Sequence, residues 1–200
     1  MKSACFLTGI SLGGIGHALG YDPPAGGAGS ATRTLEEGRA VVGANDRDEP
    51  ASQPGLTFRL MRDTDVPEVL AVEEASYLHP WSKDIFHDCL RAGYHCWVLQ
   101  VGDHLVGHGV MSLAVGECQI LNLCVHPDWQ GQQFGRRLLR RLLAIARQRN
   151  ADTAFLEVRR SNGAAIHLYQ AEGFCEVGLR RGYYPKGQGR EDAILMAKPL

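Results

Sequence analysis

Hydrophobic and polar residues follow a regular pattern from residue 56 onward and not before it. Residues 56–61 largely alternate between apolar and polar side chains, which predicts a strand. Asp63 or Thr64 can then cap a helix in which apolar residues, followed by Glu73, recur at helical spacing. Ser82 can cap a second helix, which is expected to end near Leu90.

The middle of the chain predicts three strands and a long helix. The strands are expected at residues 94–101, 104–113 and 117–125, and the helix at residues 134–148. Gly102-Asp103 fits a tight hairpin turn between the first two strands, and Pro127 ends the third. Leucines lie on one side of the helix and arginines elsewhere, as is typical of a helix at the surface of a domain.

The last part of the chain alternates between strand and helix. The expected elements are a strand at residues 153–158, a helix at 162–171 and two strands at 175–181 and 192–197. Ser161 or Asn162 can cap the helix, and the final two strands flank a loop that contains Tyr183-Tyr184-Pro185. The order β-α-α-β-β-β-α-β-α-β-β predicts an α/β fold, with a mixed sheet and helices on both faces.

The composition changes near residue 55. The first 55 residues contain 11 of the 24 glycines and few adjacent apolar residues, so they can form little core. A single Lys2 and several glycines among the first apolar residues also weigh against a signal peptide. We therefore expect a disordered, Gly/Pro-rich extension at 1–55 and one folded domain at 56–200.

Charge and cysteine content narrow the functional class. The 21 Lys and Arg residues balance 22 Asp and Glu residues, so the net charge of −1 gives no general reason to expect a nucleic acid or membrane partner. No run of apolar residues is long enough to span a bilayer. Six scattered cysteines without a CxxC pair indicate free thiols, which favours a cytoplasmic protein.

Two histidines, His104 and His108, are spaced to place both rings on one face of a strand. The sequence offers no third ligand beside them, so we expect no metal site.

The segment from Leu121 to Arg136 predicts a strand, a turn with glycines and the start of a helix. Unpaired backbone N–H groups at a helix N-terminus add to the helix dipole and suit a phosphate. An ordinary β-turn-α connection is the alternative. Neither a GxGxxG nor a GxxxxGK[ST] motif is present, so a dinucleotide-binding fold or an NTPase has no support.

A second segment places three polar residues around the predicted strand and helix near residue 160. Glu157 lies in an otherwise apolar strand, where a carboxylate is costly unless it is wet, paired or used in chemistry. Asn162 lies at the helix start, and Tyr169 follows two turns later. The simpler alternatives are an edge-strand charge at Glu157 that pairs with Arg159 across a water, a plain N-cap at Asn162 and a core aromatic residue at Tyr169.

These segments together resemble the GCN5-related N-acetyltransferase superfamily, and more closely its RimI-type ribosomal-protein alanine N-acetyltransferases. The likeness is carried by Gln130–Gly135, by LEVRRSN followed by LY and GF, and by HPWS, GYYP and GREDA at residues 79–82, 182–185 and 189–193. It covers residues 56–200 and none of the extension.

The resemblance implies a splayed pair of strands that holds acetyl-CoA. The implied coenzyme-binding residues are Leu123, Cys124, Val125, Gly131, Gln132, Gln133, Phe134, Gly135, Arg136 and Asn162. The family's phosphate loop reads Q/R-x-x-G-x-G/A, and Gln133 replaces its first glycine here. Because a glycine lets the backbone approach a phosphate closely, Gln133 is expected to weaken coenzyme binding or shift the loop.

The resemblance also assigns roles in catalysis. Glu157 is the implied general base and Tyr169 the implied general acid, in a direct transfer to the α-amine of a protein. The favoured acceptor is the N-terminal alanine of a small-subunit ribosomal protein, without direct nucleic-acid contact. Another amine acceptor, a coenzyme-binding module without turnover and a nucleophilic role for Cys124 remain as alternatives. The sequence carries no signal for an oligomeric state.

A chain that starts at Leu56 is expected to keep its melting temperature and its rate of acetyl transfer, because all matched motifs lie beyond residue 55. Thermal melts of the full and shortened chains provide the measurement. A shortened chain that no longer folds would contradict the prediction.

Overall fold

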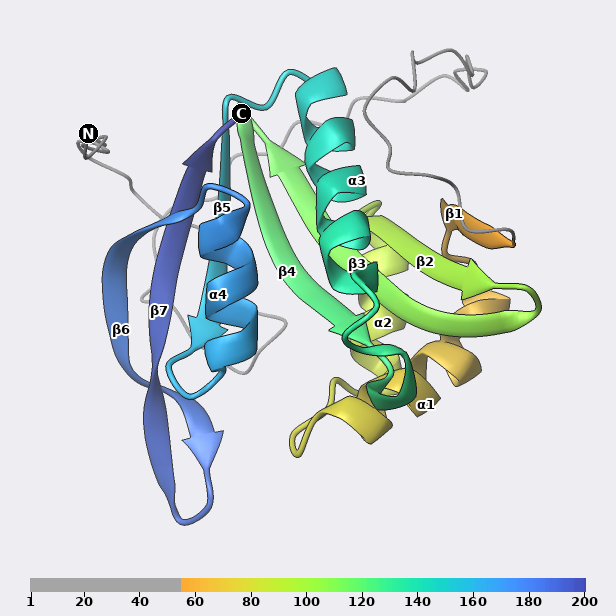
Figure 1. Cartoon of the computed structure of the whole chain (residues 1–200), viewed down its shortest axis with the longest axis horizontal. Helices are drawn as coiled ribbons and strands as arrows, with labels where there is room; N and C mark the ends of the chain where they lie inside the picture. The colour runs from red at the N-terminus through yellow and green to blue at the C-terminus, as the bar shows by residue number, and fades with distance from the viewer. Residues whose placement is uncertain (1–54) are drawn as a thin grey trace. The chain divides into compact units, whose positions relative to one another are not determined.

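The structure, a computed structural model, describes residues 55–200. The expected extension and the question of a signal peptide therefore lie outside the described residues, apart from Gly55. Seven strands form one mixed sheet in the order β1-β2-β3-β4-β5-β7-β6 (Figure 1). The strands are β1 (Leu56–Leu60), β2 (His95–Val101), β3 (His104–Ala114), β4 (Glu117–Val125), β5 (Thr153–Arg159), β6 (Cys175–Lys186) and β7 (Gly189–Pro199). The helices are α1 (Val66–Ser76), α2 (Lys83–Arg91), α3 (Phe134–Gln148) and α4 (Gly163–Ala171).

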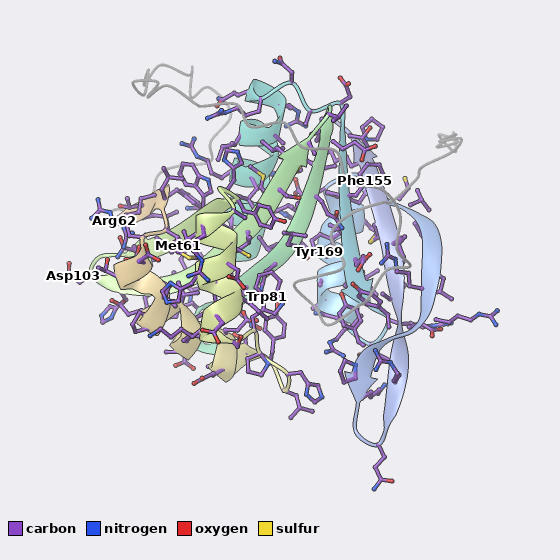
Figure 2. All side chains as sticks on the ribbon, turned by 180° about the vertical axis from the view of Figure 1, so that it is seen from behind. Met61, Arg62, Trp81, Asp103, Phe155 and Tyr169 are labelled. Atoms are coloured by element: carbon purple, nitrogen blue, oxygen red, sulfur yellow. The ribbon has the colours of Figure 1, made fainter. Side chains whose placement is uncertain are left out.

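The helices cover the sheet on both faces, as the sequence predicts. Helices α3 and α4 lie in front of the sheet in Figure 1, whereas α1 and α2 lie on the face seen from behind in Figure 2. Leu139, Leu142 and Leu143 of α3 belong to the core on the first face, and Val69 and Phe86 belong to the core on the second. Within residues 55–200, no helix has the length and apolarity needed to cross a membrane.

The predicted element order is confirmed, and several boundaries agree closely. Helix α3 has the expected bounds, and the Asn162 side chain caps α4 by accepting the Ala165 N–H at 3.1 Å. Helix α1 begins at Val66 rather than after Asp63 or Thr64, because a 3₁₀ turn at residues 63–65 comes first.

The prediction of a loop around Tyr183-Tyr184-Pro185 is wrong. These residues belong to β6, which pairs with β7 as far as Lys186 and Gly189. The Tyr184 ring lies 4.3 Å from the Arg159 guanidinium, and its hydroxyl donates to the Glu157 carbonyl at 3.3 Å. These contacts hold the segment against β5, so the strand continues past an irregularity between Arg180 and Tyr184.

The prediction that His104 and His108 share one face of a strand is also wrong. Leu99 pairs with Gly107, but the next residue of β2 pairs with Leu105, so β3 contains an extra residue at this point. Such a bulge reverses the alternation of side chains. His108 is consequently buried beneath α1 and α2, whereas His104 is exposed and its ring lies 6.5 Å from that of Trp129.

The central strands β4 and β5 pair over only part of their length. Their parallel register runs from Glu117 opposite Thr153 to Ile120 opposite Leu156 and then stops. Strand β4 continues to Val125 alongside β3, and β5 continues alongside β7, so the two strands diverge (Figure 1). This divergence is the splayed pair that the resemblance implies.

Candidate active site

A cleft occupies the region in which β4 and β5 separate. It contains about 710 Å³ of empty space, part of it open to solvent. Its walls come from α1 and the segment after it, β4, β5, α4 with its N-cap, and β6. The cleft brings together four of the residues expected in the site, Leu123, Glu157, Asn162 and Tyr169.

Glu157 lies on β5 between β4 and β7, so it is not on an edge strand. Its carboxylate Oε1 lies 3.1 Å from Nε of Arg180, and 13% of the side chain is exposed. The alternative of an edge-strand charge that pairs with Arg159 across a water is wrong about the edge strand, and the direct partner of Glu157 is Arg180, whereas the Arg159 guanidinium binds Glu191 at 2.9 Å and the Pro185 carbonyl. The carboxylate therefore faces the cleft with one cationic neighbour from β6.

Tyr169 lies on α4 and lines the cleft. The connection between α1 and α2 lines the cleft from the other side of the sheet. Figure 2 labels Tyr169 and Trp81, which lie on either side of the separation between β4 and β5. The Tyr169 ring packs edge-on against Phe174, with the ring centres 5.9 Å apart. Burial raises the pKa of Tyr169 to about 12, so the phenol keeps its proton at physiological pH.

Cys124 does not have the environment of a nucleophile. Its Sγ faces α1 and lies 3.9 Å from the Val72 carbonyl, and burial raises the pKa of its thiol to about 12. A thiol with such a pKa carries almost no thiolate near neutrality. Direct transfer is thus favoured over a covalent enzyme intermediate.

The segment from β4 to α3 has a backbone that exposes N–H groups. Gly131 and Gln133 have positive φ angles of 75° and 66°, and Gln133 is the residue immediately before α3. The Gln130 side chain donates to the Val125 carbonyl at 2.9 Å and so ties the loop to the end of β4. The first amides of an α-helix have no acceptor within the helix, which makes this end suited to an anion.

Two arginines of α3 are engaged by Glu172, the residue that follows α4. Arg140 binds its carboxylate with two hydrogen bonds of 2.8 and 3.0 Å. Arg136 lies 3.1 Å from the same carboxylate, and it also donates to the Gln133 side chain at 3.2 Å. The expected contact of Arg136 with a phosphate stays a prediction.

A buried polar cluster that was not predicted from the sequence lies on the α1 side of the cleft. Glu73, His108 and Asn122 are its members, and both Glu73 and Asn122 line the cleft. The signal in the sequence was Glu73 itself, a charged residue at a position in α1 where the spacing calls for an apolar one. Ligand atoms of Glu73, His108 and Cys124 lie within 4.8 Å of one another, which meets the spacing of a possible metal site.

Comparison with known proteins identifies the family. Residues 60–174, more than half of the chain, match the model of the acetyltransferase (GNAT) family. The chain belongs to this family and is an acetyltransferase.

Individual relatives and solved structures carry more specific names than the family does. The "[Ribosomal protein bS18]-alanine N-acetyltransferase" of Salmonella typhimurium is 37% identical over 144 residues, which cover 72% of this chain and 97% of the relative. The crystal structure of the ribosomal-protein-S18-alanine N-acetyltransferase from Escherichia coli is 36% identical, with a TM-score of 0.69, and the match covers 72% of this chain and 94% of that one. The yncA protein of Salmonella typhimurium, solved with its cofactor acetyl-CoA, shares the fold at 20% identity and a TM-score of 0.62, over 73% of this chain and 94% of that one.

Replacing Gln133 by glycine is expected to tighten acetyl-CoA binding modestly. The change removes a Cβ from a residue with φ of 66° and restores the close backbone approach. Asn150→Gly is the matched control, because Asn150 has φ of 60° at the other end of α3. Calorimetric titration with acetyl-CoA should show a gain for Gln133→Gly alone. An equal gain in both variants, or none in either, would contradict a special role for position 133.

Proposed function

We propose that this acetyltransferase transfers the acetyl group of acetyl-CoA to the N-terminal alanine of ribosomal protein bS18. The observation that carries the proposal is that Glu157 of β5 and Tyr169 of α4 line the same cleft, where β4 separates from β5. The 37% identity to a bS18-alanine N-acetyltransferase over nearly its whole length supports the choice of acceptor. Ribosomal substrates would place the reaction in the cytoplasm.

The backbone fits the proposed co-substrate. The edge of β4 from Leu121 to Val125 has no pairing with β5, so backbone groups on that edge can meet an extended chain such as pantetheine. Two of its carbonyls already accept a hydrogen bond from the protein, that of Leu123 from Tyr77 and that of Val125 from Gln130. The loop from Gly131 to Gly135 and the start of α3 offer N–H groups for the pyrophosphate. Acetyl-CoA supplies the activated thioester carbonyl, and the protein supplies the proton transfers and the orientation.

Glu157 is the proposed proton acceptor. An α-amino group has a pKa of about 7.7–8.0, so it is mostly ammonium at neutral pH and must lose a proton before it can attack. The Glu157 carboxylate faces the cleft from a strand that is paired on β7 along its length, which keeps its position fixed. Arg180 holds it from the other side at 3.1 Å. Such a carboxylate can take the proton directly or through a water molecule.

Tyr169 is the proposed proton donor to the departing sulfur. Because burial raises its pKa to about 12, the phenol stays in the donating form over the whole working range of pH. Its position on α4, two turns after the Asn162 cap, fixes the distance of the hydroxyl from β5. Backbone N–H groups at the unpaired edge of β4 are suited to the charge that develops on the carbonyl oxygen.

A coenzyme-binding module without turnover is the second candidate. Gln133 is the feature that favours it, since a strained loop could bind the coenzyme in a different geometry. The presence of both a carboxylate and a buried phenol in the cleft favours catalysis.

The first test compares acceptors with the same enzyme. A peptide that begins with the alanine-first sequence of bS18 is expected to be acetylated at its α-amine. The same peptide with its α-amine blocked and an internal lysine free should react far more slowly. Preference for the lysine peptide would overturn the proposed acceptor, and binding of acetyl-CoA without transfer to either peptide would favour the module.

The second part of the test uses Glu157→Gln and Tyr169→Phe. Each is expected to lower kcat by about 10²–10⁴-fold, the usual range for a general base or acid. The defect of Glu157→Gln should shrink as pH rises, because more acceptor amine is then neutral. That of Tyr169→Phe should persist, since the wild-type phenol keeps its proton up to a pKa of about 12.

Matched controls separate chemistry from folding. Glu176→Gln changes an exposed carboxylate on β6, and Tyr94→Phe changes a half-buried phenol before β2. Arg180→Gln breaks the ion pair of Glu157 but leaves the carboxylate, so it should lose less turnover than Glu157→Gln. Turnover near that of the wild type in Glu157→Gln and Tyr169→Phe, with lowered melting temperatures, would return both residues to a structural role.

A further inference from the structure

A buried carboxylate lies at the junction of α1, β3 and β4. Glu73 is 1% exposed, and its Oε2 lies 3.0 Å from Nε2 of His108, which is fully buried. The Asn122 amide nitrogen lies 3.1 and 3.3 Å from the two carboxylate oxygens. A carboxylate removed from water in this way is costly unless donors surround it. Each of these contacts therefore has a direct effect on where Glu73 is held.

The contacts of Glu73 define the state of His108. A carboxylate only accepts hydrogen bonds, so with Glu73 in that form the 3.0 Å contact assigns the imidazole proton to Nε2 of His108, which donates it. Nδ1 is buried without a hydrogen-bond partner, and the ring meets Phe86 edge-on with centres 5.3 Å apart. The imidazole is thus aimed at one polar target, the Glu73 carboxylate.

Glu73 in turn holds one wall of the cleft. The backbone N–H of Trp81 donates to Glu73 Oε1 at 3.1 Å. The Tyr77 hydroxyl donates to the Leu123 carbonyl at 3.1 Å, and burial holds the pKa of Tyr77 well above its usual value, so it remains a donor. The segment between α1 and α2 is therefore attached at its two ends, one end to Glu73 and the other to the unpaired part of β4.

This segment faces the cleft from the side opposite to the proposed coenzyme loop. Tyr77, His79 and Trp81 line the cleft, whereas α3, whose first residues follow the loop from Gly131 to Gln133, covers the other face of the sheet. Leu78 is 84% exposed beside them. A peptide bound in the cleft on this side would lie against this wall.

We propose that His108 is a positioning residue for acceptor binding. It fixes the Glu73 carboxylate, and through the Trp81 N–H it fixes the segment from Tyr77 to Ser82 in the shape that receives the acceptor's N-terminal residues. The inference rests on the proposed function for the identity of the acceptor. It assigns His108 no contact with either substrate, so its loss acts on the acceptor KM and leaves coenzyme binding unchanged.

The test compares His108→Phe with His108→Gln. Phenylalanine keeps a ring against Phe86 and removes the donor, whereas the glutamine amide places an N–H group near the position of Nε2. Val110→Ala is the matched packing control, because Val110 is fully buried two residues along the same strand and has no polar role. Two quantities are measured, the KM for the alanine-first peptide and the exchange rate of the Trp81 amide hydrogen.

His108→Phe is expected to raise the acceptor KM and the exchange rate of Trp81 about tenfold, because the lost hydrogen bond is made to a charged group. The affinity for acetyl-CoA and the exchange of the Asp152 amide, which donates to Gly116 at the other end of β4, should not change. His108→Gln should restore both quantities, and Val110→Ala should lower the melting temperature without altering either.

Unchanged KM and Trp81 exchange in His108→Phe would overturn the proposal, as would equal changes in His108→Phe and Val110→Ala. Zinc that raises the melting temperature of the wild type but not of His108→Phe would instead assign a metal site to Glu73, His108 and Cys124. If the wild type acetylates no alanine-first peptide, the proposed function fails. The Trp81 exchange rates then still decide whether His108 holds this wall.

Discussion

The separation of β4 from β5 after Ile120 and Leu156 determines the rest of the site. Strands that stayed paired would use their N–H and C=O groups on each other, and no edge would remain for a ligand. Here each strand keeps its other neighbour, β3 for β4 and β7 for β5, so the sheet stays intact around the opening. A register shift beside Leu121, opposite Val110 and Met111, accompanies the change. The β4 and β5 walls of the cleft are therefore strands fixed within the sheet, and the segment from Tyr77 to Trp81 adds a further wall.

The opening has two chemically different sides. On the side of α3, a loop with positive φ angles leads into a helix N-terminus, which suits phosphates. On the side of α1 and α2, the buried Glu73 holds Trp81 and binds His108 and Asn122. Glu157 and Tyr169 lie between the two sides, on β5 and α4. In the proposed reaction, acetyl-CoA binds on the first side and the acceptor amine on the second, and they meet beside the carboxylate and the phenol.

Local patterns predicted the fold well, and long-range features could not be predicted. The leucines of α3 follow a helical period, and the Asn162 cap depends on neighbours three residues away, so both could be derived from the sequence. The bulge in β3 that places His104 and His108 on opposite faces arises from pairing with β2, and no residue type in β3 predicts it.

Contacts between residues distant in sequence were also not predicted. The ion-pair partner of Glu157 is Arg180 and not the expected Arg159. Arg180 lies on β6, which the strand order β5-β7-β6 brings near β5, and spacing along the chain does not show that order. The cluster around Glu73 joins residues 35 and 49 positions apart, so spacing along the chain could not reveal it. The family resemblance singled out Glu157, Tyr169 and Asn162, which line the same cleft, and their roles stay predictions. Periodicity alone left each of them with a structural alternative.

The central claim is that the coenzyme binds along the unpaired edge of β4, and amide hydrogen exchange with and without coenzyme A tests it most directly. A ligand bound along this edge shields the backbone amides of β4 from water and so slows their exchange. Saturating coenzyme A should slow the exchange of amides in Leu121–Val125 and in the loop from Gly131 to Arg136, and leave those of the β1–β2 pair unchanged. Exchange in Leu121–Val125 that stays the same while coenzyme A is bound would show that the coenzyme lies elsewhere and would contradict the account.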